Sequence, residues 1–142
     1  MLSVKNLEVV YQDVILVLRG ISFEIPKGEI VSLLGSNGSG KTTALRAITG
    51  LLDTQNGDIT KGQIFVENQD ITNAEPSKIV SLGIAQVLEG RRIFSELTVT
   101  ENLRLGGFTN NGAVQENMNR VFDLFPILKP VSYTHLRAHE TS

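Results

Sequence analysis

Residues 29–52 read EIVSLLGSNGSGKTTALRAITGLL, and the stretch GSNGSGKT at 35–42 matches the phosphate-binding loop pattern GxxxxGK[ST] in full. The residues before the loop, 29–34, are mostly apolar and include β-branched side chains, which predicts a strand buried on both faces. After the loop, apolar residues recur at helical spacing, and Gly50 is a suitable terminator. A strand, a glycine loop and a helix in this order predict a binding site for a nucleoside triphosphate.

The residue types in the loop explain why it would bind phosphate. Gly35, Gly38 and Gly40 can adopt positive φ and carry no Cβ, so successive backbone N–H groups can surround an anion. The N-terminus of the following helix adds unpaired N–H donors and partial positive charge. Lys41 supplies a cation for the β- and γ-phosphates, and the Thr42 hydroxyl is a suitable ligand for Mg²⁺. The alternative is a Gly/Ser-rich turn that happens to end in Lys-Thr, and the flanking strand and helix patterns disfavour it.

The composition indicates one ordinary globular domain. The chain has 142 residues, of which 41% are hydrophobic and 20% charged, and its net charge of −2 gives no general attraction for nucleic acid or an anionic membrane. The absence of cysteine excludes disulfides, thiolate metal sites and thiol catalysis, and is typical of a cytoplasmic chain. No apolar run is long enough to span a bilayer, so we expect membrane contact only through a partner.

Other elements follow from periodicity and turn signals. Apolar and polar residues alternate at 7–11 and 21–25, before a break at 26–28, which predicts a small antiparallel β-layer ahead of the phosphate-binding unit. The stretch 53–62 is polar and glycine-containing, and predicts a loop. The remaining predicted elements are strands at 63–67 and 84–88, helices beginning at Pro76 and after a capping box at 98–101, and a helix from Val114 to Phe125.

The order of these features resembles the ATP-binding subunit of ABC transporters. The stretch IAQVLEGRRIFSELTVTENLRL at 84–105 is similar to the subunit that serves branched-chain or hydrophobic amino-acid importers, and the resemblance runs from about Leu2 to about Pro130. It implies an α/β P-loop NTPase fold, represented by the N-terminal part of the nucleotide-binding domain. It also implies ATP and Mg²⁺ as ligands, transmembrane permease subunits and a second ATP-binding subunit, in a homo- or heterodimer, as partners, and a position on the inner face of the cell membrane.

The resemblance assigns roles beyond the loop. Tyr11 matches the aromatic residue that stacks on adenine, although a tyrosine half-buried in a strand is an equal alternative from spacing alone. Glu89 occupies the position of a glutamine that touches Mg²⁺ and the attacking water in most members; a carboxylate can bind Mg²⁺ but cannot donate a hydrogen bond when ionised. Gln86 is expected only to fill a polar position in a strand. The predicted nucleotide contacts are Tyr11, Gly35, Ser36, Asn37, Gly38, Ser39, Gly40, Lys41, Thr42, Thr43 and Glu89, with Thr42 and Glu89 as Mg²⁺ ligands.

Several motifs that hydrolysis requires in this family do not occur in the 142 residues. There is no LSGGQ-type signature; the nearest string, LGGF at 105–108, lacks its serine and glutamine. No apolar strand ends in Asp-Glu, and no switch histidine follows, so we expect nucleotide binding with no catalytic base in this chain. Residues 1–130 are therefore interpreted as a partial domain that stops before the signature motif. The stretch 131–142, VSYTHLRAHETS, is unlike the family and is interpreted as a non-native tail, in which His135 and His139 are not expected to form a metal site.

Two other interpretations are considered. A GTPase or small-molecule kinase also uses this loop, but the chain lacks the NKxD and DxxG motifs of a GTPase. A non-catalytic fragment without a stable native state is the third interpretation, because Val31, Leu33 and Leu34 would lack part of the cover that a central strand needs.

Overall fold

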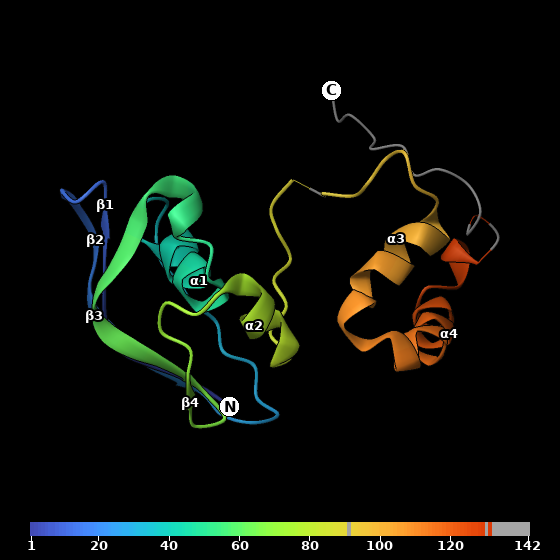
Figure 1. Cartoon of the computed structure of the whole chain (residues 1–142), viewed down its shortest axis with the longest axis horizontal. Coiled ribbons are helices and arrows are strands. Elements are labelled where there is room, and N and C mark those ends of the chain that lie inside the picture. The colour runs from blue at the N-terminus through green and yellow to red at the C-terminus, as the bar shows by residue number, and fades with distance from the viewer. Residues whose placement is uncertain (91, 130, 132–142) are drawn as a thin grey trace. The chain divides into compact units, whose positions relative to one another are not determined.

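The computed structural model describes residues 1–90, 92–129 and 131, and the chain forms two compact units, Met1–Gln86 and Val87–Ser142 (Figure 1). Each unit is considered by itself. The predicted non-native tail, with His135 and His139, lies outside the described residues except for Val131. No helix in the described part of the chain is both long and apolar enough to cross a bilayer.

The first unit contains one four-stranded sheet with the strand order β2-β1-β3-β4. The long strands β1 (Leu2–Tyr11), β2 (Ile15–Ile25) and β3 (Gly57–Val66) are antiparallel to their neighbours, and β4 (Gln69–Asp70) pairs with β3. The predicted antiparallel β-layer is therefore confirmed. It is larger than expected, because its third strand comes from beyond the phosphate-binding loop.

Strand β3 begins at Gly57, whereas the sequence predicted a loop over 53–62. Only Asp53–Gln55 is a short turn, of 3₁₀ type. Polar residues of β3 face solvent, and Gly62 adopts φ +92° where a Cβ atom would meet the Asn6 carbonyl oxygen. The glycines that suggested a loop instead allow neighbouring strands to approach closely. A single sequence does not distinguish a glycine of this kind from a glycine in a turn.

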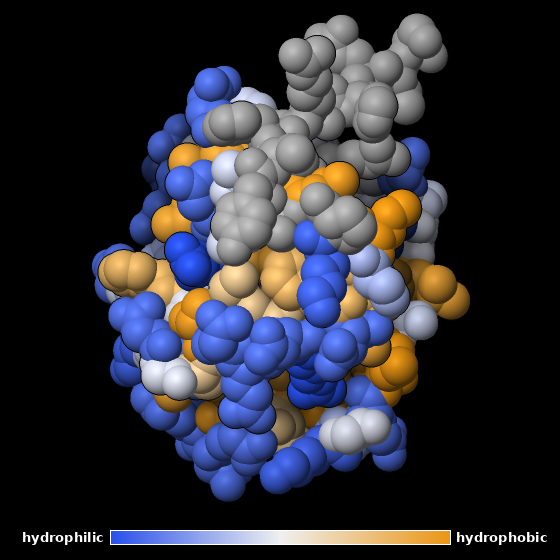
Figure 2. Space-filling model, turned by 90° about the vertical axis from the view of Figure 1, so that its right-hand side faces the viewer, coloured by the Kyte–Doolittle hydropathy of each residue, from blue (hydrophilic) through white to orange (hydrophobic). Residues whose placement is uncertain are grey.

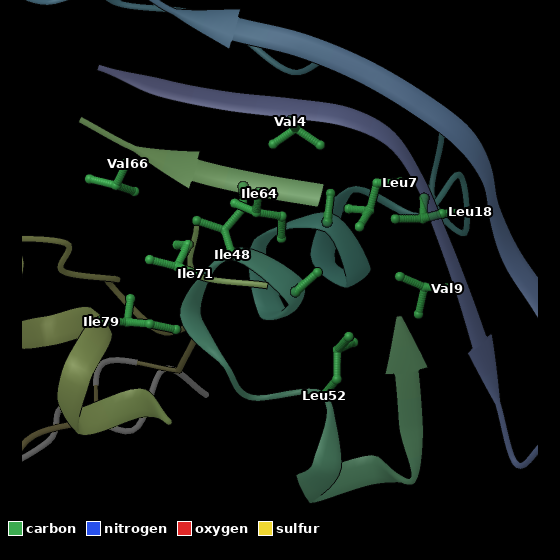
Figure 3. Close-up of a cluster of buried hydrophobic side chains, with 12 residues drawn as sticks. Val4, Leu7, Val9, Leu18, Ile48, Leu52, Ile64, Val66, Ile71 and Ile79 are labelled. Atoms are coloured by element: carbon green, nitrogen blue, oxygen red, sulfur yellow. The ribbon is translucent and has the colours of Figure 1, made fainter. Parts of the chain in front are cut away.

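Helix α1 (Lys41–Thr49) packs against the sheet and forms the core with it (Figure 3). The helix ends at Gly50, which has φ +72° as predicted for a C-terminal glycine, and α2 (Pro76–Ser81) begins at its predicted proline. The fully or nearly buried side chains of this core are Val4, Leu7, Val9, Leu18, Ala44, Ala47, Ile48, Leu52, Ile64, Val66, Ile71 and Ile79. Because strands and α1 contribute to one apolar cluster, the β-layer holds the phosphate loop's helix in place.

The segment 29–34, predicted as a strand buried on both faces, lies outside helix and strand in the described structure. Ile30 is 97% exposed and Leu34 is 90% exposed, so the prediction of burial is wrong for this chain. A parallel strand is stabilised by neighbours on both edges and helices on both faces, and the described residues provide no neighbouring strand here. The predicted strand at 84–88 is likewise not formed.

The second unit is helical. It contains α3 (Val99–Gly106), a 3₁₀ segment (Phe108–Ala113), α4 (Val114–Leu124) and a final 3₁₀ turn (Pro126–Leu128). The predicted capping box is confirmed. The Glu101 backbone N–H donates to the Thr98 hydroxyl at 3.2 Å, and the Thr98 backbone N–H donates to the Glu101 carboxylate at 2.8 Å.

Many apolar side chains remain accessible to solvent. Figure 2 shows several hydrophobic patches between hydrophilic side chains on the face that it presents. In the second unit the exposed large apolar side chains include Phe94, Leu105, Phe108, Leu124, Phe125 and Ile127.

Candidate nucleotide-binding site

The sequence pattern predicted positive φ at three glycines of the loop at 35–42, and two of the three adopt it. Gly38 has φ +83° and Gly40 has φ +95°, conformations that side chains rarely adopt. Gly35 does not have positive φ; its requirement is space, because a Cβ atom there would lie 2.4 Å from the Ser39 hydroxyl oxygen. The Ser39 backbone N–H donates to the Ser36 carbonyl at 3.1 Å, which closes the turn within the loop.

The N-terminus of α1 is open toward an anion. Gly40 is the N-cap residue, no side chain caps the helix, and its first turn contains no acidic residue. The Ala44 N–H donates to the Gly40 carbonyl at 2.9 Å, which leaves the N–H groups before it without acceptors within the helix. These donors and the partial positive charge of the helix end suit a phosphate group.

The cation of the site lies across the same loop. The Lys41 ammonium group donates to the carbonyl oxygens of Gly35 and Ser36, the latter at 3.3 Å. These neutral carbonyls are weaker partners for an ammonium group than a phosphate oxygen would be. The arrangement therefore holds a positive charge beside the helix N-terminus and leaves it available to an incoming anion.

The two threonines after Lys41 differ in environment. Thr42 is exposed, so its hydroxyl is accessible to a hydrated cation. Thr43 is buried, and its hydroxyl lies 3.3 Å from the Tyr11 hydroxyl, where either group can donate. The hydroxyl pair connects the end of β1 to the first turn of α1.

Tyr11 is half-buried and packs against the core at the end of β1. Its ring lies close to the backbone of Gly57, since a Cβ atom at Gly57 would be 2.6 Å from the Tyr11 Cε1 atom. This is the half-buried strand tyrosine that spacing alone allowed. The same position, with its contact to the phosphate loop's helix, also suits an adenine platform, which remains a prediction.

Gln86 and Glu89 are separated by the boundary between the two units. Gln86 accepts a hydrogen bond from the Thr49 hydroxyl of α1 at 2.8 Å and so has a structural role in the first unit. Glu89 belongs to the second unit, where its side chain is exposed and its backbone carbonyl accepts from the Arg92 Nε at 3.3 Å. The first unit brings Tyr11 together with Thr43, in the first turn of the helix that follows the loop.

No group of three or more His, Asp or Glu residues suited to a metal ion occurs within residues 1–90, 92–129 and 131. The hydroxyl of Thr42 and the phosphates of a nucleotide are suitable Mg²⁺ ligands, and the exposed Thr42 fits this use. A different hollow of about 260 Å³ is lined in part by Asp53, Asp58 and Glu75, and these acidic side chains make it unsuitable for a triphosphate.

Sequence reasoning missed two residues that support the site. Leu18 of β2 packs against Gly40, and Gly57 of β3 packs against Tyr11. Both contacts join residues far apart in the chain: the pairing of β1 with β3 brings Tyr11 to Gly57, and the packing of α1 against the sheet brings Gly40 to Leu18. Nothing in the local pattern around either residue indicates them.

Comparison with known proteins agrees with this fold and loop. A family model described as ABC transporter matches residues 18–140. The high-affinity branched-chain amino acid transport ATP-binding protein BraG of Pseudomonas aeruginosa is 42% identical over 84% of this chain and 49% of its own length. The probable branched-chain amino acid transport ATP-binding protein LivF of Archaeoglobus fulgidus is 33% identical over 80% of this chain and 46% of its own.

A solved structure shows the same fold. The ADP conformation of an ATP-binding cassette of an ABC transporter has a TM-score of 0.72 and 29% identity, over 100% of this chain and 59% of that chain. The chain belongs to the ABC transporter family, with the α/β P-loop nucleotide-binding fold that the sequence resemblance implied. It spans about half the length of the curated relatives named above.

Proposed function

We propose that this chain binds Mg-ATP as part of an ATP-binding subunit of an importer for branched-chain amino acids. The observation that carries the proposal is the cluster formed by Lys41 and the uncapped N-terminus of α1 around a loop with two positive-φ glycines. The names of the two relatives support the transported substrate class, since both are branched-chain amino acid transport ATP-binding proteins.

Roles within the site follow the chemistry of its residues. The backbone N–H groups of 35–43 and the Lys41 ammonium group bind the phosphates, and the Thr42 hydroxyl is a ligand of Mg²⁺. The Tyr11 ring stacks on the adenine, for which its place beside the first turn of α1 is suitable. For Glu89 we propose the role that the family resemblance implies, a carboxylate ligand of Mg²⁺.

Hydrolysis would be attack of water on the γ-phosphate, and Lys41 would offset the charge that develops on the transferred group. The 142 residues contain no signature motif and no general-base glutamate after an apolar strand. We therefore propose that residues 1–130 act as a partial nucleotide-binding domain, which binds nucleotide with negligible turnover by itself, and that 131–142 is not native to it.

The partners in this proposal are transmembrane permease subunits and a second ATP-binding subunit. Membrane contact would occur only through the permease, at the cytoplasmic face, and no nucleic acid is involved. The net charge of −2 supports the last point, because nucleic-acid binding needs a concentration of basic charge.

The experiment is a titration of the 142-residue chain with Mg-ATP, followed by thermal melting and by fluorescence of a labelled ATP analogue. The melting temperature is expected to rise with Mg-ATP, since only the folded site binds the ligand. Lys41→Ala should abolish the rise, whereas Lys78→Ala, which removes an exposed lysine from α2, should retain it. GTP should compete about as well as ATP, because an aromatic platform does not read the base edge. A rise that Lys41→Ala leaves intact contradicts the proposal, as does phosphate release by the chain at a rate dependent on Lys41.

A further inference from the structure

Gly57, the first residue of β3, lies directly opposite Tyr11 in the register of β1 and β3. A Cβ atom at Gly57 would be 2.6 Å from Tyr11 Cε1 and 2.9 Å from Tyr11 Cδ1. The backbone of Gly57 is not in the left-handed region, so alanine would meet no conformational strain there. Glycine is therefore favoured at this buried position chiefly because the tyrosine ring occupies the space of a side chain; the Leu52 Cδ2 atom, 3.3 Å from the added Cβ position, is a looser second neighbour.

The ring is held at its other end by α1. The Tyr11 hydroxyl lies 3.3 Å from the Thr43 hydroxyl, and Thr43 is in the first turn of the helix that follows the phosphate loop. The backbone around the contact is also bonded, because the Gly57 N–H donates to the Leu52 carbonyl at 3.1 Å and the Gln12 N–H donates to the Asn56 carbonyl at 2.8 Å. A side chain at Gly57 would thus displace the ring more readily than the strand.

We propose that Gly57 is a positioning residue for the nucleotide base, which acts by letting the Tyr11 ring lie against the backbone of β3 and reach Thr43. The inference rests on the proposed ATP-binding function. It extends that function by separating two parts of the site. Gly57 and Tyr11 determine how the base is bound, and the loop with Lys41 determines how the phosphates are bound.

This separation gives a measurable signature. Stacking of a base on an aromatic side chain is lost when the ring is displaced, and the expected loss of ATP affinity in Gly57→Ala is about fivefold or more. Inorganic triphosphate has no base, so its affinity should change by less than about twofold in the same variant. A purely structural role for Gly57 would weaken both ligands together.

The experiment measures the Kd of Mg-ATP and of Mg-triphosphate for the 142-residue chain and four variants. Gly57→Ala is compared with Gly112→Ala, a glycine of ordinary φ at which an added Cβ atom would meet nothing within 4 Å. Tyr11→Val, alone and combined with Gly57→Ala, completes a double-mutant cycle. Valine at position 11 removes the two closest neighbours of the added methyl group, so Gly57→Ala should change ATP affinity and melting temperature much less in that background than in the wild-type chain.

The outcomes distinguish this inference from the proposed function. Equal weakening of ATP and triphosphate in Gly57→Ala overturns the inference, and so does an undiminished effect in the Tyr11→Val background. If Gly57→Ala does not fold but the double variant does, the steric link between Gly57 and Tyr11 is supported. If neither of these variants folds while Tyr11→Val alone does, another neighbour of Gly57 is the obstacle and the inference is wrong. Failure of the wild-type chain to bind either ligand through Lys41 instead contradicts the proposed function.

Discussion

The Leu18 side chain fills the space that a Cβ atom on Gly40 would need, with the Leu18 Cδ2 atom 2.5 Å from that position. Leu18 belongs to β2 and is buried, and Gly40 is the N-cap of α1. The N-terminus of α1 therefore packs directly against β2 of the β-layer.

Gly40→Ala is expected to destabilise the first unit by about 2 kcal/mol or more, because it combines positive-φ strain with overlap on Leu18. Gly38→Ala is the matched control, since Gly38 has φ +83° but an added Cβ atom would meet nothing within 4 Å. Denaturant unfolding of both variants measures the difference. Equal losses of stability would mean that the Leu18 contact has no energetic weight, whereas partial recovery in Gly40→Ala/Leu18→Ala would support it.

Asn102 joins α3 to the segment before it. Its side-chain oxygen accepts from the Phe94 N–H at 3.0 Å, and its amide donates to the carbonyls of Phe94, Leu97 and Thr98 at 3.0 to 3.2 Å. We expect Asn102→Ala to cost the second unit about 1–3 kcal/mol, because the part-buried carbonyls of Leu97 and Thr98 lose their donor.

Hydrogen exchange at the Phe94 amide measures the Asn102→Ala effect directly, and the variant should exchange faster. Asn119→Ala is the control, since the Asn119 side chain accepts a local hydrogen bond from the Gln115 amide, one helical turn away, at 3.2 Å. Unchanged protection of Phe94 in Asn102→Ala would contradict the prediction.

Glu8 links β1 to β3 and should make stability depend on acid. The Thr60 hydroxyl donates to its carboxylate at 2.8 Å and Lys61 lies 3.2 Å from it, and these hydrogen bonds hold the pKa of Glu8 below its ordinary value of 4.5. A carboxyl group whose pKa is lower in the folded state than in the unfolded state stabilises the fold fully when the pH is above its unfolded-state pKa. That contribution is lost as the pH falls through its folded-state pKa.

Urea midpoints of the wild-type chain should therefore decrease more steeply than those of Glu8→Gln as the pH is lowered from about 5 to about 3. Glu24→Gln serves as the comparison, because it removes a carboxylate from β2 without affecting Thr60 or Lys61. Parallel pH profiles for wild type and Glu8→Gln would contradict the linkage.

Because the apolar residues of 29–34 are exposed, we expect this segment to tolerate polar substitutions. Ile30→Thr and Leu34→Thr should change the free energy of unfolding by no more than about 0.5 kcal/mol, since neither side chain is buried in this chain. Both variants should also remain soluble at higher concentration, because they reduce an exposed apolar surface. Ile64→Thr, in the core, should instead be strongly destabilising. A loss of stability in Ile30→Thr similar to that of Ile64→Thr would refute the observed exposure.

Elements with local signals could be predicted from the sequence. The helix after the loop, its end at Gly50, the start of α2 at Pro76 and the capping box of Thr98 all follow from residues within a few positions. The conformations of Gly38 and Gly40 were also predictable, because the loop pattern specifies them within a continuous stretch.

Features that depend on distant partners were not predictable in the same way. The stretch 29–34 has the composition of a central strand, but a strand forms only where neighbours are present to pair with it. The true start of β3 and the packing of Tyr11 on Gly57 depend on the register with β1, which no local pattern states.

Because β1 lies between β2 and β3 in the sheet, its two edges are paired at different times during synthesis. The β1–β2 hairpin can form as soon as residue 25 has emerged, but the other edge of β1 stays open until β3 follows. At about 5–20 residues per second this interval lasts roughly two to eight seconds. The phosphate loop lies between β2 and β3 in the chain, so it leaves the ribosome before the strand that holds Tyr11 in position. A nascent chain thus contains the residues of the phosphate loop before it contains the strand that packs against Tyr11.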